Sequence, residues 1–267
     1  ERRIKSRQPV TVQALIDGTD VNNARVIQNS LQATTQFFLR SSNLIPEQAQ
    51  SPINPRVRLW FNPGRREALY IVPGIFGVIL WVFPSILSAI ALVREKEQGN
   101  VVQVYASDLS AVEWLLGKEL AYLIVGLGEA LVVMVVAMLL FGLRLRGDPT
   151  TLIVGSVIYV AVAVAFGLLI GARSSNQTGA VQGTAIAGFL SALLLSGFIY
   201  RIDNIPFPLS LLSNVIPARY FIDITRDAFV RGTGWLGIWY APLAIALIGI
   251  FFFRLAVRIL HRMQFSD

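Results

Sequence analysis

The chain has 267 residues, of which 54% are hydrophobic and only 15% charged, and its mean hydropathy is +0.60. These values lie outside the range of ordinary soluble domains, so a lipid bilayer is the expected solvent. The formal charge of +7 is scattered between apolar blocks, which argues against nucleic-acid binding. With no cysteine and a single histidine, the sequence offers neither disulfides nor a Cys or His metal cluster.

The first 69 residues differ in kind from the rest and predict a small water-facing α+β element. Residues 10–16 have the pattern of a strand, and apolar residues at helical spacing predict a helix over residues 21–39. Residues 57–60 have the pattern of a second strand. The chain begins without an initiator Met or a recognisable signal peptide, so we expect residues 1–69 to be part of a larger domain.

Five long apolar segments follow. A helix needs about 20 apolar residues, at about 1.5 Å each, to cross a hydrocarbon layer of about 30 Å. Five segments meet this requirement, namely residues 70–93, 120–143, 151–172, 179–200 and 235–253. Glu129 is the only acidic or basic side chain within them. The sequence therefore predicts an all-α polytopic membrane protein with a partial α+β element at its N-terminus.

The loop between the first two spans, residues 94–119, predicts a helix, a turn and a second helix. Its first charged residues continue the preceding span into water. Gly99 followed by Asn100 favours a helix stop, because both residues tolerate a positive φ. Ser110 followed by Glu113 three residues later forms a capping box and so predicts the start of the next helix.

A second polar connector, about residues 205–232, lies between the last two spans. Pro217 can occupy the first turn of a helix. Arg219 to Asp223 and Asp227 to Arg231 are each four residues apart, and apolar residues form a stripe between them. This pattern predicts a helix along the membrane surface.

The orientation of the chain depends on the basic residues that flank the spans, which divide almost evenly between the two sides. The basic residues of the second connector have acidic neighbours at helical spacing. Those of the tail, Arg254, Arg258 and Arg262, have none before Asp267. We therefore expect a cytoplasmic C-terminus, with residues 1–69 on the other side of the membrane.

The two connectors resemble those of the membrane permease subunits of type-2 ABC exporters. That family has an Arg-Glu-x-Glu-x-Gly segment after its second helix, a Gly-Lys before the third, and an Asn-x-x-Pro-x-x-Tyr-x-x-Asp-x-x-Arg stretch before the last. The residues that match are Arg94, Glu95, Glu97, Gly99, Gly117 and Lys118 in the first connector, and Asn214, Pro217, Tyr220, Asp223 and Arg226 in the second. Asn100 and Asp108 depart from the Thr and Pro that the family often has.

The resemblance implies six spans, of which this chain has the second to the sixth and lacks the first. It also implies that residues 94–119 form a cytoplasmic coupling loop that docks on a separate ABC ATPase, in a bacterial-type inner membrane. Two permeases and two ATPases would form the working unit. The chain has no phosphate loop of its own, because Val112 stands where Gly117-Lys118 would need a glycine. ATP-Mg is therefore expected on the partner.

Two polar residues within the spans have alternative readings. Glu129 and Gln182 could line a transport pathway or contact a neighbouring helix. A buried carboxylate also keeps an ion-coupled carrier or a channel open as an alternative to an exporter. An intramembrane enzyme is the weakest reading, because the spans offer no His or Asp beside Glu129. For the substrate we expect a drug-like or lipidic small molecule, and the assembly is expected to contact lipid.

Overall fold

The computed structural model of the chain describes residues 10–17, 21–41, 53–62, 64, 66–107, 109–200 and 202–264. The chain forms two compact units, Glu1–Tyr70 and Ile71–Asp267.

The first unit contains a two-stranded parallel sheet and one helix. Strand β1 (Val10–Asp17) pairs along its length with strand β2 (Ile53–Trp60), and helix α2 (Val21–Ser41) lies between them in sequence. Ile16 and Ala24 are buried, so the sheet and the helix share a small apolar core. Parallel strands need such a crossover connection, because a tight turn can join only antiparallel ones.

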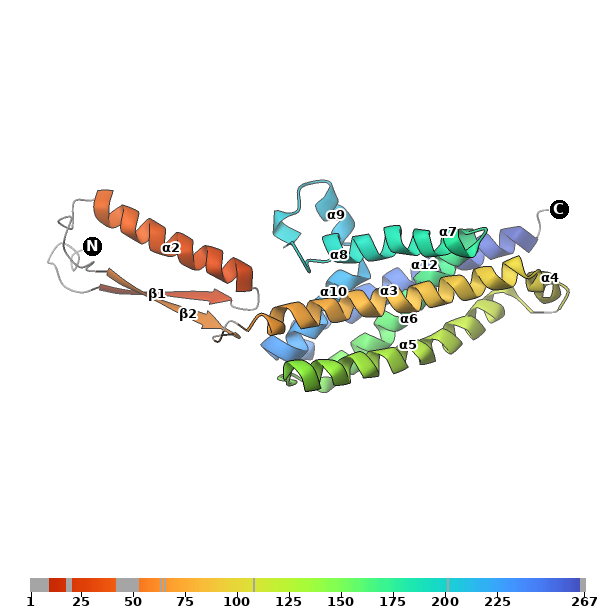
Figure 1. Ribbon diagram of the computed structural model, residues 1–267, viewed down its shortest axis with the longest axis horizontal. Helices are drawn as coiled ribbons and strands as arrows, with labels where there is room; N and C mark the ends of the chain where they lie inside the picture. The colour runs from red at the N-terminus through yellow and green to blue at the C-terminus, as the bar shows by residue number, and fades with distance from the viewer. Residues whose placement is uncertain are drawn as a thin grey trace. The chain divides into compact units, whose positions relative to one another are not determined.

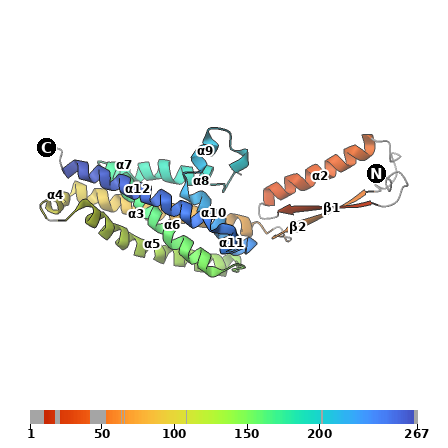
Figure 2. The same ribbon diagram turned by 180° about the vertical axis from the view of Figure 1, so that it is seen from behind.

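The second unit is a bundle of helices (Figures 1 and 2). Among the described residues, five helices are long and apolar enough to cross a membrane. They are α3 (Ala68–Glu97), α5 (Ala111–Phe141), α6 (Pro149–Arg173), the helix formed by α7, η1 and α8 (Gln177–Leu195), and α12 (Tyr240–Gln264). The predicted all-α polytopic membrane fold is confirmed.

Local capping explains where several of these helices begin and end. The Ser110 hydroxyl accepts a hydrogen bond from the backbone N–H of Glu113, and the Glu113 carboxylate accepts one from the Ser110 N–H at 2.9 Å. This capping box starts α5 at Ala111, well before the apolar run at residue 120. At the start of α6, the backbone N–H of Thr150 donates to the Asp148 carboxylate and lowers the pKa of that group.

The helix expected over residues 179–200 is not regular. It consists of α7 (Gln177–Thr184), a π-helical stretch η1 (Ala185–Leu190) and α8 (Ser191–Leu195). A π-helical turn is wider than an α-helical one and displaces the residues that follow it. The apolar pattern carried no sign of this irregularity, because every residue involved is compatible with an α-helix.

Helix α6 lies at the centre of the bundle, where it packs against α3, α5 and α12 (Figures 1 and 2). In the most apolar stretch of α6, 67% of the residues are buried, against 17% in that of α5. Most side chains of α5 therefore point away from the bundle. Small residues allow α3 to approach α6 closely. The hydroxyl of Ser85 donates to the carbonyl of Ala163 at 2.8 Å, and that of Ser88 to the carbonyl of Val164 at 3.1 Å.

The second connector differs from the single surface helix that its sequence predicts. It consists of η2 (Ile202–Asn204), α9 (Leu209–Ser213), α10 (Pro217–Arg226) and η3 (Asp227–Arg231), followed by α11 (Trp235–Ile238). The ring of Phe221 stacks on that of Tyr159 at 4.0 Å between centroids, and the Thr225 hydroxyl donates to the carbonyl of Pro73 at 2.9 Å. Helix α10 therefore packs its apolar side against α3 and α6.

Candidate functional site

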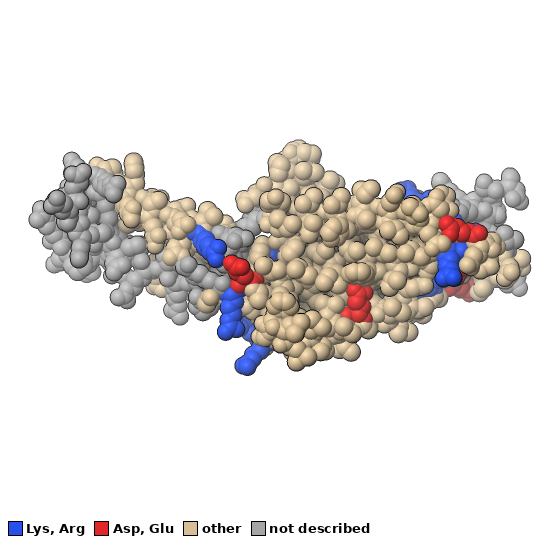
Figure 3. Space-filling view, viewed as in Figure 1, with Lys and Arg blue, Asp and Glu red and all other residues tan. Residues whose placement is uncertain are grey.

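Charged side chains gather toward the two ends of the helical unit, and its middle is largely uncharged on the face that Figure 3 shows. At one end lie the last turn of α3, the short helix α4 (Asn100–Tyr105) and the first turns of α5. We call this group of residues, 94–119, the α4 end. It coincides with the loop that the sequence singles out. Asp108, one of the departures from the family pattern, lies outside the described residues.

Glu95 connects α3 to α5. Its carboxylate forms an ion pair with the Lys118 ammonium at 2.5 Å, and the two side chains are 34% and 12% exposed. The Lys118 ammonium also lies 5.4 Å from the centre of the Trp114 ring. Because the pair is partly buried, water and salt screen its attraction less than that of an exposed pair. The ion pair can therefore hold the two helices together.

Lys96 connects α3 to the end of α6. Its ammonium donates hydrogen bonds to the carbonyls of Gly171, Ala172 and Ser174 at 3.3, 2.9 and 2.7 Å. The last carbonyls of a helix have no partner within the helix and form the negative end of its dipole. Lys96 therefore caps α6 from another helix. Lys96 was not predicted as a site residue, because the carbonyls to which it donates lie far away in sequence.

Glu97 connects α3 to the start of α7. Its carboxylate accepts a hydrogen bond from the backbone N–H of Gln177 at 3.0 Å and another from the Gln177 side-chain amide. Because the first N–H groups of a helix lack internal acceptors, a carboxylate is favourable at this position. Gln177, like Lys96, was not predicted as a site residue from the sequence.

Three consecutive side chains thus join α3 to three different helices. Successive residues of an α-helix point about 100° apart, so Glu95, Lys96 and Glu97 necessarily reach in different directions. Gly99, with φ of 72°, then ends the helix and turns the chain into α4. The last turn of α3, immediately before α4, thus contacts α5, the end of α6 and the start of α7.

Two other predicted residues of the α4 end have no such contact. Arg94 is exposed, and none of the described side chains pairs with it. Gly117 lies within α5, and a Cβ atom built on it would meet no atom within 4 Å. Both residues therefore face outward, where a second protein could reach them.

The predicted residues of α10 form a hydrogen-bonded cluster at its start. Pro217 occupies its first turn, the Tyr220 hydroxyl donates to the carbonyl of Asn214 at 2.9 Å, and the Arg219 guanidinium donates to the Asn214 side chain. Burial raises the pKa of Asp223, although nearby arginines and a hydrogen bond from a tyrosine oppose this effect.

Arg226 and Asp227 connect the end of α10 to its surroundings. The Arg226 guanidinium donates to the carbonyl of Gly197 at 3.2 Å. Asp227 is fully buried, and its carboxylate accepts hydrogen bonds from the backbone and hydroxyl of Thr233 and from the N–H of Gly234 at 2.6–3.0 Å. The spacing had suggested a pair with Arg231. These donors hold the Asp227 carboxylate instead, because the π-turn η3 brings the following loop back onto it.

The two polar residues of the spans lie in different surroundings. Glu129 is half-buried on α5, beside a close helix contact at Gly126, where an added Cβ would lie 2.5 Å from Val160. Gly128 has no such neighbour within 4 Å. Gln182 is exposed on α7. Helix α5 therefore lies close to α6 at Gly126 and has open space at Gly128.

Comparison with known proteins agrees with the resemblance inferred from the two connectors. The family model described as ABC-2 family transporter protein matches residues 1–258. The probable multidrug ABC transporter permease YbhS of Escherichia coli K12 is 29% identical over 233 residues, 87% of this chain and 62% of the relative. YbhR, of the same description and strain, is 28% identical over 250 residues, 91% of this chain and 66% of the relative.

A third relative, the inner membrane transport permease YhhJ of the same strain, is 24% identical over 266 residues, 95% of this chain and 68% of the relative. The chain spans less than two thirds of the length of YbhS and YbhR. The family match extends over both compact units and all five membrane-spanning helices. The chain therefore belongs to the ABC-2 family of transporter proteins, as a membrane permease domain.

Proposed function

We propose that the chain is the permease of an ATP-driven exporter whose ATPase is a separate subunit, and that the α4 end is the surface on which this ATPase docks. The C-terminus and the α4 end would then face the cytoplasm of a bacterial-type cell, with residues 1–69 outside the inner membrane. Two permeases, identical or homologous, would form the pathway between them.

The observation that carries this proposal is the set of contacts made by Glu95, Lys96 and Glu97. A docking surface can drive transport only if its movement reaches the membrane helices. Each of these three side chains joins α3 to a different helix, while Arg94 and Gln103 of α4 are exposed and could meet another protein. The α4 end thus combines an outward-facing surface with rigid connections to α5, α6 and α7.

The substrate is proposed from the relatives and from the chemistry of the chain. YbhS and YbhR are described as probable multidrug permeases. The side chains that the spanning helices expose are almost entirely apolar, and the half-buried Glu129 lies among them. A drug-like or lipidic small molecule is the class that such walls accommodate.

Charge reversal at Glu97 tests the docking proposal. The full-length permease is co-purified with candidate ABC ATPases and reconstituted in vesicles, and ATP-driven export is measured. We expect Glu97→Arg to lower coupled transport by about tenfold or more, because coupling between sites is commonly worth 5–150-fold. The variant loses the contact to Gln177 and presents the opposite charge to the partner.

Glu67→Arg is the matched control, because Glu67 is an exposed carboxylate of the first unit whose side chain is 62% exposed. This reversal should leave both ATPase binding and transport unchanged. Unchanged binding and unchanged transport in the Glu97 variant as well would refute the coupling role.

A further inference from the structure

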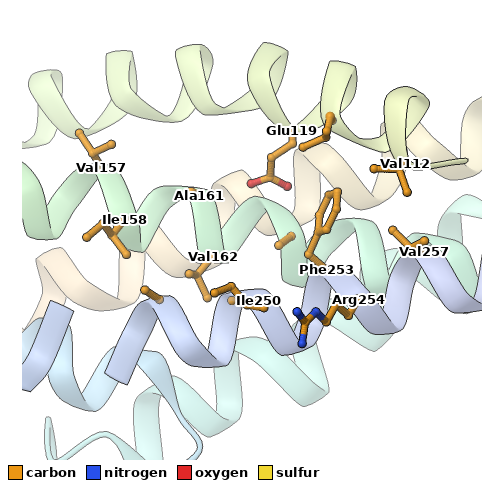
Figure 4. A pocket seen from close by; sticks show the side chains of 14 residues that line it. Val112, Glu119, Val157, Ile158, Ala161, Val162, Ile250, Phe253, Arg254 and Val257 are labelled. Atoms are coloured by element: carbon orange, nitrogen blue, oxygen red, sulfur yellow. The ribbon is translucent and has the colours of Figure 1, made fainter. Parts of the chain in front are cut away.

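A pocket of about 660 Å³ lies between α5, α6 and α12. Its walls are aliphatic apart from the ring of Phe253 and two charged side chains, Glu119 of α5 and Arg254 of α12 (Figure 4). Pockets of about 300–1,000 Å³ with mainly apolar walls and a few polar groups are typical sites for small molecules. The pocket shares Val112, Leu116 and Glu119 with the α4 end, but none of the contacts made by Glu95, Lys96 and Glu97 lies in it.

Glu119 is the unusual group of the pocket. One of its carboxylate oxygens, Oε2, is fully enclosed and has no hydrogen-bond partner among the described residues. Figure 4 shows the carboxylate pointing from α5 into the space between the helices. A carboxylate that is removed from water without a partner is strongly disfavoured in its charged form, so an occupant that supplies a positive charge would stabilise that form.

Arg254 does not supply this charge. It projects from the α12 wall, opposite Glu119 (Figure 4), and the structure contains no ion pair between the two side chains. Arg254 is exposed and follows the apolar part of α12. A long basic side chain near the end of a span can extend its charge into water or toward lipid headgroups, where solvent screens it. The enclosed ionisable group of the pocket is therefore a carboxylic acid, and a positive charge beside it would favour its ionised form.

We propose that this pocket binds a hydrophobic organic cation. Glu119 would pair with the positive charge, and the aliphatic walls would cover the apolar body. The ring of Phe253 can add a cation–π contact, since an aromatic face attracts a cation within about 6 Å. Charge complementarity is the reason for favouring a cation over a lipid tail, which would fill the apolar volume and leave the Glu119 oxygen unpaired.

As a statement about the transported substrate, this inference rests on the proposed exporter function. As a statement about binding it stands alone, because no ATPase is required for a ligand to enter the pocket. A binding assay without nucleotide therefore separates the two: failed transport with intact binding would count against the exporter function alone.

Two probes of the same shape and opposite charge provide the test. Tetraphenylphosphonium and tetraphenylborate have similar size and apolar surface, so a difference in their affinity reports the sign of the charge in the pocket. Binding of each ion to the purified full-length permease is measured by equilibrium dialysis. We expect the cation to bind about tenfold or more tightly than the anion, and Glu119→Gln to abolish most of this preference.

Glu67→Gln is the matched control, because Glu67 is an exposed carboxylate of the first unit that does not line the pocket. It should leave the cation affinity unchanged. A second variant, Ala161→Phe, fills the pocket from α6 and should weaken binding of the cation without altering any charge. Equal affinity for the two ions would overturn the proposal, as would equal losses in the Glu119 and Glu67 variants.

Discussion

Gly167→Ala is expected to destabilise the helical unit by about 1–3 kcal/mol, or to prevent its folding altogether, because overpacking a tight core forces backbone shifts. A Cβ on Gly167 would lie 2.1 Å from the carbonyl oxygen of Ser85 and 2.1 Å from the Ser88 hydroxyl. The first of these atoms belongs to the backbone of α3 and cannot rotate away. The only relief is a separation of α3 from α6, which would break the hydrogen bonds of both serines.

The same substitution at Gly128 is the control. Gly128 also lies within a spanning helix, but a Cβ there would meet no atom within 4 Å. Gly128→Ala should therefore be neutral or slightly stabilising, since alanine favours helices over glycine by up to about 1 kcal/mol. The measurement is the midpoint of thermal aggregation of the detergent-solubilised protein. Equal midpoints for the two variants would show that the contact of α3 with α6 is looser than described.

Asp227→Ala is expected to have the second large effect. Removal of the Asp227 carboxylate leaves the backbone N–H groups of Thr233 and Gly234 without their acceptor. Gly234 is buried, so water cannot readily replace the carboxylate there. Hydrogen bonds to charged groups contribute about 1.5–3 kcal/mol each, and a buried donor left unsatisfied costs about as much. We therefore expect a loss of a few kcal/mol, measured by the same thermal assay.

Asp227→Asn serves to separate hydrogen bonding from packing. The asparagine keeps the size of the side chain and one carbonyl oxygen, so its stability should fall between those of the wild type and the alanine variant. An alanine variant as stable as the wild type would contradict the role of Asp227 in holding the loop after η3.

The spanning helices were predictable because hydrophobicity over 20 residues is a local property of the sequence. The same holds for the start of α5, since the Ser110 and Glu113 capping box involves residues only three apart. The helix boundaries that were predicted wrongly, those of the second connector, depend on packing against helices that are distant in sequence. Helix α10 contacts α3 and α6 through Thr225 and Phe221, and no pattern within the connector indicates which distant helices will receive them.

The same distinction applies to the candidate site. The sequence identified Glu95, Glu97 and Lys118 through the family motif, but it did not identify their partners. Lys96 was overlooked because its acceptors are backbone carbonyls at the end of α6, which leave no trace in residue identity. Glu119 was treated as the end of a loop, since only the packing of α5 against α6 and α12 shows that its carboxylate enters a pocket.

We propose that the α4 end meets the ATPase, and a cross-link from a single introduced cysteine tests this most directly. These 267 residues contain no cysteine, so a cysteine introduced at the exposed Gln103 of α4 is the only one among them. A photoactivatable cross-linker on Gln103→Cys, applied in membranes that contain the full transporter, is predicted to capture an ABC ATPase. The same reagent on Phe207→Cys, beside α9 and 79% exposed, is predicted to capture none. An ATPase attached through position 207, or through neither position, would contradict the account.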